Sequence, residues 1–259
     1  MHIARIRLNL SSDNELLPFY CGHLGMRAFE GDKALVLGYD RHQCCLEFHQ
    51  GEFQPLYGGG DAFYWKIGIT VGDLDAAVRH LRERGVPVSD PTQFQDIGYM
   101  SHLADPNGFQ IELLQQGFEG NAKPVTAGAH PVTVFGILAH VTLRITDLAA
   151  AKRVCEDKLN MRLMSVQGIE VPGRKFRLFF YAWSQDELPD PDLEAVANRE
   201  WLWERPYTLL ELMHLEDPAP AIRGRMPDEA GFTGLGFTDR DGSLKYISAE
   251  DLAEGQVEA

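Results

Sequence analysis

The sequence has few cysteines, no long apolar run and no recognisable leader. None of its four cysteines, Cys21, Cys44, Cys45 and Cys155, falls in a C-x-x-C pair or a zinc-type spacing. They are therefore expected to be free thiols in a reducing compartment rather than disulfides or zinc ligands. No stretch approaches the roughly 20 apolar residues of a membrane span, and residues 1–15 turn polar too early for a signal peptide. We expect a cytoplasmic protein without a membrane partner.

Positive charge is also scarce. The chain has 24 Lys and Arg against 38 Asp and Glu, a formal net charge of −14. Nucleic-acid binding needs clustered Lys and Arg to contact phosphates, so no nucleic-acid partner is expected. With 259 residues, of which 44% are apolar, the chain can form one large or two medium hydrophobic cores.

Short segments recur along the chain in the same order, which indicates a repeated structural module. A strand-to-helix segment, VGDLDAA, returns as ITDLAAA, and a late strand, CLEFH, returns as LLELMH. The segment that follows the helix, HLGMR, returns as KLNMR. Each copy continues with further strand-like pieces, so the pattern predicts βαβββ modules.

The helices of these modules can be predicted from their caps. Asp73 is a good N-cap, and Gly85 stands where a helix would end. Between them, apolar residues follow the helical spacing i, i+3, i+4 and i+7, namely Leu74, Ala77, Val78 and Leu81. Asp147 is expected to cap the equivalent helix of the later copy.

The modules are predicted at about 1–52, 62–117 and 136–215. A fourth module opens near residue 232, but the chain that remains is too short for a helix and three more strands. The fold class is therefore α+β, with tandem βαβββ modules of which the fourth is truncated.

These modules divide the chain into three predicted sections. We predict an N-terminal domain of two modules (1–117), a linker rich in Gly, Ala and Pro (118–135), and a C-terminal domain (136–259).

The order of several segments resembles a known family. AHVTLRITDLAAAKRVCEDKLNMRL, FRLFFYAW, WLWERPYTLLELMH and GFTGLGF are similar in order and spacing to eukaryotic-type glyoxalase I. The N-terminal segments FYCGHLGM and DPNGFQIELL are typical of the wider vicinal-oxygen-chelate superfamily, which includes glyoxalases, bleomycin-resistance proteins and extradiol dioxygenases. The resemblance implies that the modules pair into open mixed-sheet barrels.

The resemblance also implies a metal site between two modules. In the family each module supplies a His or Gln from its first strand and a Glu from its last, and the ion binds the adjacent oxygens of the substrate. Carried over to this chain, the implied ligands are His140, Glu211 and Glu112. The ion would be Zn, Ni, Fe or Mn.

The other family positions are changed. Lys66 stands where the second module should have a histidine, and Arg5 stands at that position in the first module, beside Glu47. Gly234 takes the histidine position of the truncated module. We therefore expect one surviving centre between the second and third modules and one lost centre. Lys66 either replaces the charge of a metal, so that no cofactor is bound, or takes part in proton transfer.

The leading hypothesis is a metal-dependent lyase or isomerase similar to lactoylglutathione lyase, acting on a small molecule with adjacent oxygens. Glu211, Glu112 and Lys66 are the candidate catalytic residues. The candidate substrate-binding residues form a second set, namely Arg144, Thr142 and Trp203. Glutathione could form part of the substrate, although Leu215 replaces the Asn with which the family contacts that peptide.

Other functions stay open. A non-catalytic binding protein of the same fold, of the antibiotic-sequestering type, is the first alternative. An extradiol dioxygenase is favoured least, because that class takes its ligands from the fourth module. The truncated module would leave strand edges uncovered, which predicts a homodimer.

Overall fold

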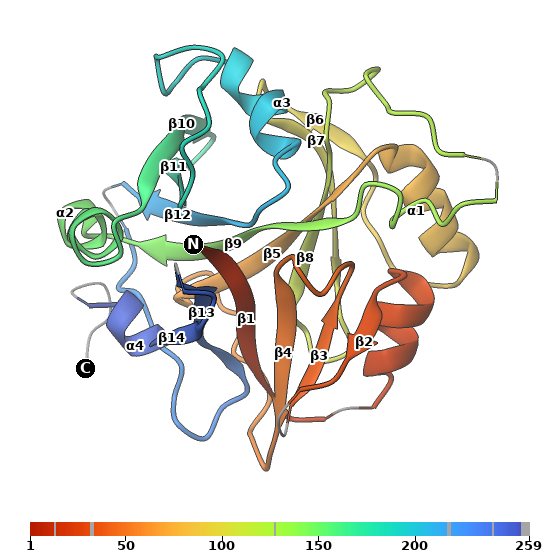
Figure 1. Cartoon of the computed structure of the whole chain (residues 1–259), viewed down its shortest axis with the longest axis horizontal. Coiled ribbons are helices and arrows are strands. Elements are labelled where there is room, and N and C mark those ends of the chain that lie inside the picture. The colour runs from red at the N-terminus through yellow and green to blue at the C-terminus, as the bar shows by residue number, and fades with distance from the viewer. Residues whose placement is uncertain (13, 32–33, 127, 217–218, 240, 255–259) are drawn as a thin grey trace.

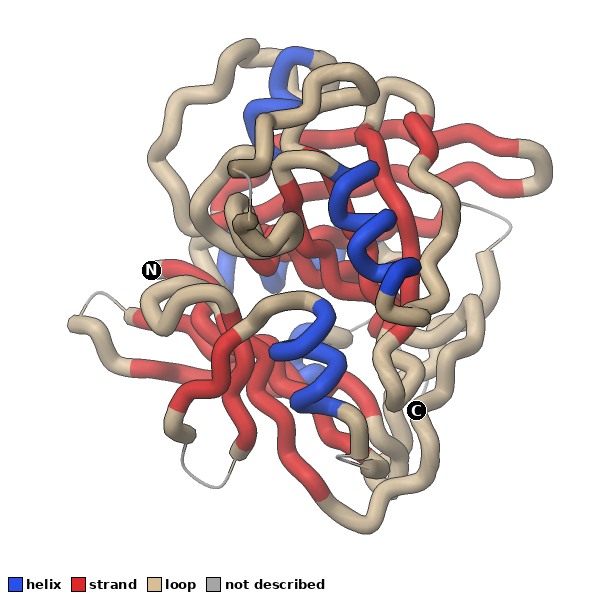
Figure 2. The backbone as a smooth tube through the Cα atoms, turned by 90° about the vertical axis from the view of Figure 1, so that its right-hand side faces the viewer, coloured by secondary structure: helices blue, strands red, loops and turns tan. Residues whose placement is uncertain are grey.

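The computed structural model describes residues 1–12, 14–31, 34–126, 128–216, 219–239 and 241–254. The strands form two mixed sheets, of six and eight strands. Figure 2 shows them as an upper and a lower group. One residue of the predicted linker, 127, and the end of the predicted C-terminal domain, 255–259, lie outside the described residues.

The six-stranded sheet joins the first module to the truncated fourth. Across the sheet its order is β14 (Leu244–Ser248), β13 (Gly231–Thr238), β1 (His2–Leu10), β4 (Cys45–Gln50), β3 (Leu35–Gly38) and β2 (Arg27–Phe29).

The eight-stranded sheet joins the third module to the second. Its order is β10 (Arg162–Val171), β11 (Arg174–Ala182), β12 (Leu209–Leu215), β9 (Ile137–Ile145), β5 (Tyr64–Val71), β8 (Gln110–Gln115), β7 (Gly98–Ala104) and β6 (Thr92–Phe94).

Each complete module has the same internal pairing. Its first strand lies parallel to its last, as β1 does to β4, β5 to β8 and β9 to β12. A helix makes the crossover, and the remaining strands add antiparallel edges. This arrangement confirms the predicted α+β fold of curled mixed sheets. The expected pairing of modules, second with third and first with the truncated fourth, is also confirmed.

The helices are short and their caps follow the sequence. Helix α1 (Leu74–Glu83) has Asp73 as its N-cap, which accepts a hydrogen bond from Ala76, and its four predicted apolar residues are buried. The later helix is α2 (Leu148–Lys152), which continues as the π-helix η2 (Arg153–Lys158). The others are the π-helix η1 (Pro18–His23), α3 (Ala197–Trp203) and α4 (Ala249–Leu252). None of the helices in these described ranges is long and apolar enough to cross a membrane.

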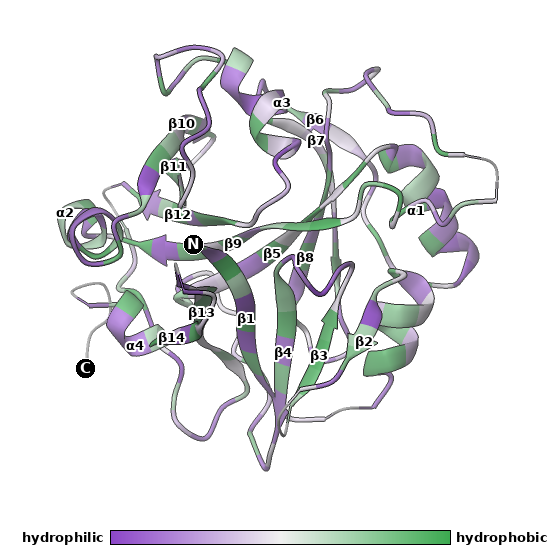
Figure 3. Ribbon diagram, in the orientation of Figure 1, coloured by the Kyte–Doolittle hydropathy of each residue, from purple (hydrophilic) through white to green (hydrophobic). Residues whose placement is uncertain are grey.

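The strands explain where the core and the polar residues lie. Along β1 hydrophobic and hydrophilic residues alternate (Figure 3), and Ile6, Leu8 and Leu10 are buried while the residues between them are partly exposed. Strand β9 is buried along nearly its whole length, because it lies in the middle of the eight-stranded sheet. Figure 1 shows β9 beside β5, the pair that unites the two halves of the chain. Polar side chains on these central strands are therefore forced into the interior.

The four cysteines are free thiols, as expected. Burial raises the pKa of Cys44 and Cys155 to about 12. Neither thiol is therefore suited to act as a nucleophile at neutral pH.

Candidate functional site

Four buried ionisable side chains meet where the second and third modules pair. His140 comes from β9, Glu211 from β12, Glu112 from β8 and Lys66 from β5. The Nε2 atom of His140 lies 3.3 Å from Glu112 Oε1 and 3.3 Å from Glu211 Oε2. Each of the four side chains is at most 5% exposed. The structure thus brings together the residues that the sequence places in one composite centre, which we call the composite cluster.

The strand register holds His140 in this cluster. In the antiparallel β5–β9 pair, His140 lies directly opposite Gly68. A Cβ atom at position 68 would collide with three atoms of the His140 ring. The imidazole therefore occupies space that a side chain on β5 would otherwise take.

Glu112 is the neutralised member of the cluster. Its Oε2 atom accepts a hydrogen bond from the Lys66 ammonium, and His102 Nε2 lies 3.1 Å from the same oxygen. Burial acts to raise the pKa of Glu112, but the Lys66 charge and the His102 contact hold it well below its ordinary value. The carboxylate therefore stays ionised.

Glu211 is only partly satisfied. Its Oε2 atom accepts a hydrogen bond of 2.9 Å from Thr142. Among the described residues, its other oxygen, Oε1, is buried without a hydrogen-bond partner. Neither ring nitrogen of His140 forms a hydrogen bond there, although Nε2 lies within ion-pair distance of both carboxylates. A buried polar atom without a partner is costly, so these unpaired atoms indicate a place where a bound molecule can form hydrogen bonds.

The composite cluster forms the polar floor of a largely apolar cavity of about 270 Å³. The rest of the lining is mainly aromatic and aliphatic and includes Trp65, Phe94, Ile97, Met100, Leu114, Ile169, Val171, Phe176, Leu178, Phe180 and Trp203. Arg174 and His102 are further polar lining residues. Apolar walls around a few convergent polar groups are typical of small-molecule sites.

The predicted substrate-binding residues lie in different places. Trp203 lines the cavity, with its ring centre 6.2 Å from that of His140, and its Nε1 donates to the carbonyl of Ile97. Thr142 is not part of the lining and instead orients Glu211. Arg144 also lies outside the lining, since it stacks on Trp65 and donates to the carbonyl of Ala62 at 2.9 Å.

His102 is a lining residue that the sequence analysis does not identify. It lies opposite Glu112 in the β7–β8 hairpin. The DPNG turn at residues 105–108 joins these two strands and sets Ala104 opposite Gln110. In an antiparallel pair this register also sets His102 opposite Glu112. The sequence therefore held a signal that would have found it.

In the equivalent centre of the six-stranded sheet, neighbouring side chains satisfy the Glu47 carboxylate. Glu47 accepts hydrogen bonds from Arg7 at 3.0 Å and from the Tyr246 hydroxyl at 2.9 Å, and His49 Nε2 lies 2.7 Å away. Arg5 adds an ion pair at 3.8 Å. Burial acts to raise the pKa of Glu47, but the His49, Tyr246 and Arg7 contacts lower it below its ordinary value. This is the centre that was expected to be lost.

The cluster does not fit the metal centre that the family resemblance implies. Lys66 takes the place of the fourth ligand and its ammonium is already bonded to Glu112. Among the residues that the structure describes, no group of three or more His, Cys, Asp or Glu side chains is arranged to hold a metal ion. The metal-ligand roles of His140, Glu211 and Glu112 therefore stay predictions.

Comparisons with known proteins place the fold. Residues 2–113 match the family model of the Glyoxalase/Bleomycin resistance protein/Dioxygenase superfamily. No curated protein matches the chain by sequence.

Solved structures resemble nearly the whole chain. Glyoxalase I from Zea mays is 14% identical with a TM-score of 0.61, and the match covers 98% of this chain and 77% of that one. A candidate dioxygenase from Bacillus subtilis is also 14% identical, with a TM-score of 0.54 and coverage of 99% and 88%. At this identity the likeness shows the fold alone.

Proposed function

We propose that this chain, whose residues 2–113 match the model of the glyoxalase, bleomycin resistance protein and dioxygenase superfamily, is a glyoxalase-like lyase or isomerase. Its substrate would be a small molecule with two adjacent oxygens. The observation that carries this proposal is the unpaired Oε1 atom of Glu211, buried beside His140 and near the Lys66–Glu112 ion pair on the floor of an apolar cavity. Burying four ionisable groups costs free energy, and a cavity that only sequesters apolar molecules has no use for them.

The proposed reaction moves a proton between neighbouring carbons. Glu211 takes the proton from the carbon that carries the hydroxyl group, and the electron pair of that C–H bond forms an enediolate with the adjacent carbonyl. Glu211 then returns the proton to the former carbonyl carbon, while the proton of the original hydroxyl group moves to the former carbonyl oxygen, so that no oxidant or reductant is needed. Lys66 and His140 supply the positive charge and the N–H donor that stabilise the enediolate oxygens.

The substrate is expected to be largely apolar. The walls above the cluster are aromatic and aliphatic, and Arg144, one of the predicted substrate-binding residues, donates to backbone carbonyls instead. Leu215 is buried. A hemithioacetal of glutathione is therefore a poorer fit than a small hydroxyketone.

A direct test uses 2-hydroxyacetophenone in D₂O, followed by proton NMR. We expect the purified protein to catalyse loss of the methylene signal, since each enediolate that forms takes up deuterium from Glu211. The same protein should fail to isomerise the hemithioacetal of methylglyoxal and glutathione. Metal content is measured in parallel for the wild type and for His140→Ala.

The outcomes separate the alternatives. Stoichiometric metal that is lost in His140→Ala would replace this mechanism with the metal-dependent form, in which His140, Glu211 and Glu112 are ligands. Metal-free protein that binds hydroxyketones tightly without exchange would support the second candidate, a non-catalytic binding protein. The observation favouring that candidate is the Lys66–Glu112 ion pair, which neutralises one carboxylate without any bound ion.

A further inference from the structure

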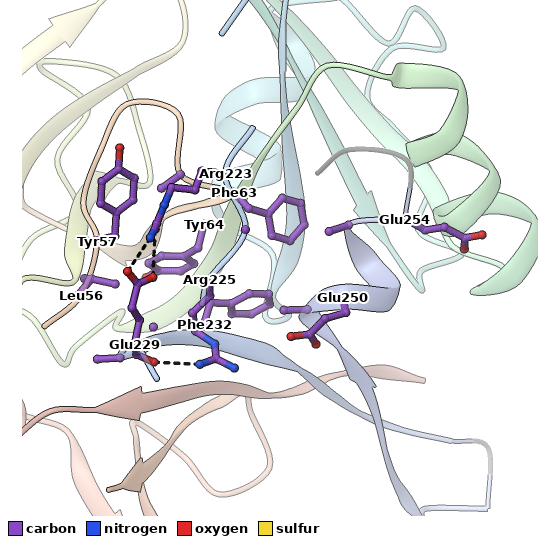
Figure 4. Close-up of a pocket in the computed structure, with 16 residues that line it drawn as sticks. Leu56, Tyr57, Phe63, Tyr64, Arg223, Arg225, Glu229, Phe232, Glu250 and Glu254 are labelled. Atoms are coloured by element: carbon purple, nitrogen blue, oxygen red, sulfur yellow. Dashed lines mark hydrogen bonds and ion pairs between the residues drawn. The ribbon is translucent and has the colours of Figure 1, made fainter. Parts of the chain in front are cut away.

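A second cavity, of about 320 Å³, lies apart from the first and shares no lining residue with it. Figure 4 shows its walls, which come from segments far apart in the chain. They are the start of β5 with the loop before it, the segment from Arg223 to Phe232, and helix α4. Short parallel bridges join the first two, from Gln54 to Glu229 and from Ala62 to Arg223.

The walls of this second cavity are suited to a flat ring. Tyr64 and Phe232 stack with an interplanar angle of 14° and ring centres 5.6 Å apart. Phe63 is also a lining residue, and the small residues Ala249 and Ala253 line the side formed by α4. Stacked aromatic walls favour aromatic guests over flexible aliphatic ones.

Of the two arginines in the lining, Arg223 is already neutralised. It forms a bidentate ion pair with Glu229, with bonds of 3.0 and 2.6 Å. Its guanidinium also lies over the Tyr57 ring, 4.0 Å from the ring centre. Arg223 is therefore part of the wall rather than a free recognition group.

Arg225 is different. Its Nη1 atom donates to backbone carbonyls of Met226, Pro227 and Glu229, and no ion pair with a carboxylate is found for it among the described residues. Its Nε atom is buried without a hydrogen-bond partner. Figure 4 shows the side chain beside Phe232. Within the described residues, the cavity thus contains a guanidinium that forms no ion pair with a carboxylate and whose buried Nε–H group lacks an acceptor.

From these observations we infer that the second cavity is a binding site for a small aromatic carboxylate. The ring would occupy the space beside Phe63 and the Tyr64–Phe232 pair, and the carboxylate would accept hydrogen bonds from Arg225. Three glutamates line the cavity, and they do not oppose this. Glu229 is neutralised by Arg223. Glu250 is exposed, and Glu254 is 61% exposed and paired with Lys158, so that solvent screens both.

The test uses 2-naphthoate and its neutral counterpart 2-naphthamide, titrated into the full-length protein in a calorimeter. The wild type should bind naphthoate about tenfold more tightly than naphthamide, the difference expected for one charge-assisted contact. Arg225→Gln should remove that preference. Ala253→Phe, which adds a ring on the α4 side of the cavity, should weaken both probes.

Two controls locate the binding. Arg205→Gln removes a guanidinium that stacks on Trp201 outside the cavity and should leave the preference unchanged. Met100→Trp partly fills the first cavity and should not affect naphthoate. The inference fails if the wild type binds neither probe, if Arg225→Gln and Ala253→Phe both bind naphthoate like the wild type, or if Met100→Trp abolishes the binding.

Discussion

The two centres of this molecule start from equivalent positions and differ in how far their charges are satisfied. Glu47 and Glu112 each lie on the last strand of a module that has lost the family histidine from its first strand. Glu47 is surrounded by two arginines, a histidine and a tyrosine hydroxyl. Beside Glu112, the third module adds His140 and Glu211, whose polar atoms stay partly unpaired.

On the proposed function, this difference separates a structural centre from a functional one. A buried carboxylate whose hydrogen-bonding capacity is filled by neighbouring side chains makes the fold more rigid and more stable, but it offers no unpaired atom to a ligand. Buried groups without partners reduce stability, and in a cavity they are available to a ligand. The neighbouring module, rather than the module that carries the glutamate, therefore determines which centre can bind.

The largest expected effect is on catalysis. Glu211→Gln should lower the rate of deuterium exchange by roughly 10²–10⁴-fold, the usual contribution of a general base. Glu47→Gln should leave that rate unchanged, because Glu47 lies on the other sheet. Rates are measured by NMR with folding checked by circular dichroism. Equal losses in the two variants would show that the centres are not functionally distinct.

The second-largest expected effect is on the free energy of unfolding, which should differ between variants of the two centres. Lys66→Met leaves Glu112 buried without its ammonium partner, with only the imidazoles of His102 and His140 beside it among the described residues, and should cost about 3–5 kcal/mol of unfolding free energy. Urea denaturation measures the loss. The double variant Lys66→Met with Glu112→Leu should recover most of it, because the unpaired charge is gone. A double variant as unstable as the single one would mean that lysine packing, not charge, matters.

The matched change in the other centre should be milder. Arg7→Met removes a side chain that is 31% exposed, and Arg5, His49 and Tyr246 still contact Glu47. We expect a loss of about 1 kcal/mol in the same urea experiment. A loss as large as that of Lys66→Met would contradict the view that Glu47 has redundant partners.

The smallest effect concerns pH. Both glutamates have a folded-state pKa below the ordinary value of 4.5. The unfolded chain therefore binds more protons in that range, so their stabilisation is complete above about pH 4.5 and is lost as pH falls through the folded pKa. Glu112→Gln should flatten the fall in stability below pH 4.5 more than Glu47→Gln does. Denaturant melts at several pH values check the order.

Much of this arrangement could be predicted from the sequence, because it depends on local signals. Asp73 and Gly85 mark the ends of α1, and the repeated segments predict which strands pair. The family resemblance predicted that His140 and Glu211 lie on the first and last strands of the third module, and they lie on β9 and β12.

The remainder depends on contacts that no local pattern encodes. Arg144 donates to carbonyls of a loop some 80 residues earlier in the sequence. The second cavity exists only because the segment before β5 meets the segment before β13. The register of the DPNG hairpin is an intermediate case, since it could have revealed His102.

Gly68 has a consequence for how the site can change. Its missing side chain makes the notch in which the His140 ring lies. Gly68→Ala would therefore displace the imidazole, although the sequence would still contain all four ionisable residues of the composite cluster. Protein engineers could therefore silence or reshape the cavity floor from the neighbouring strand, and any relative with a bulkier residue at this position must orient its histidine differently.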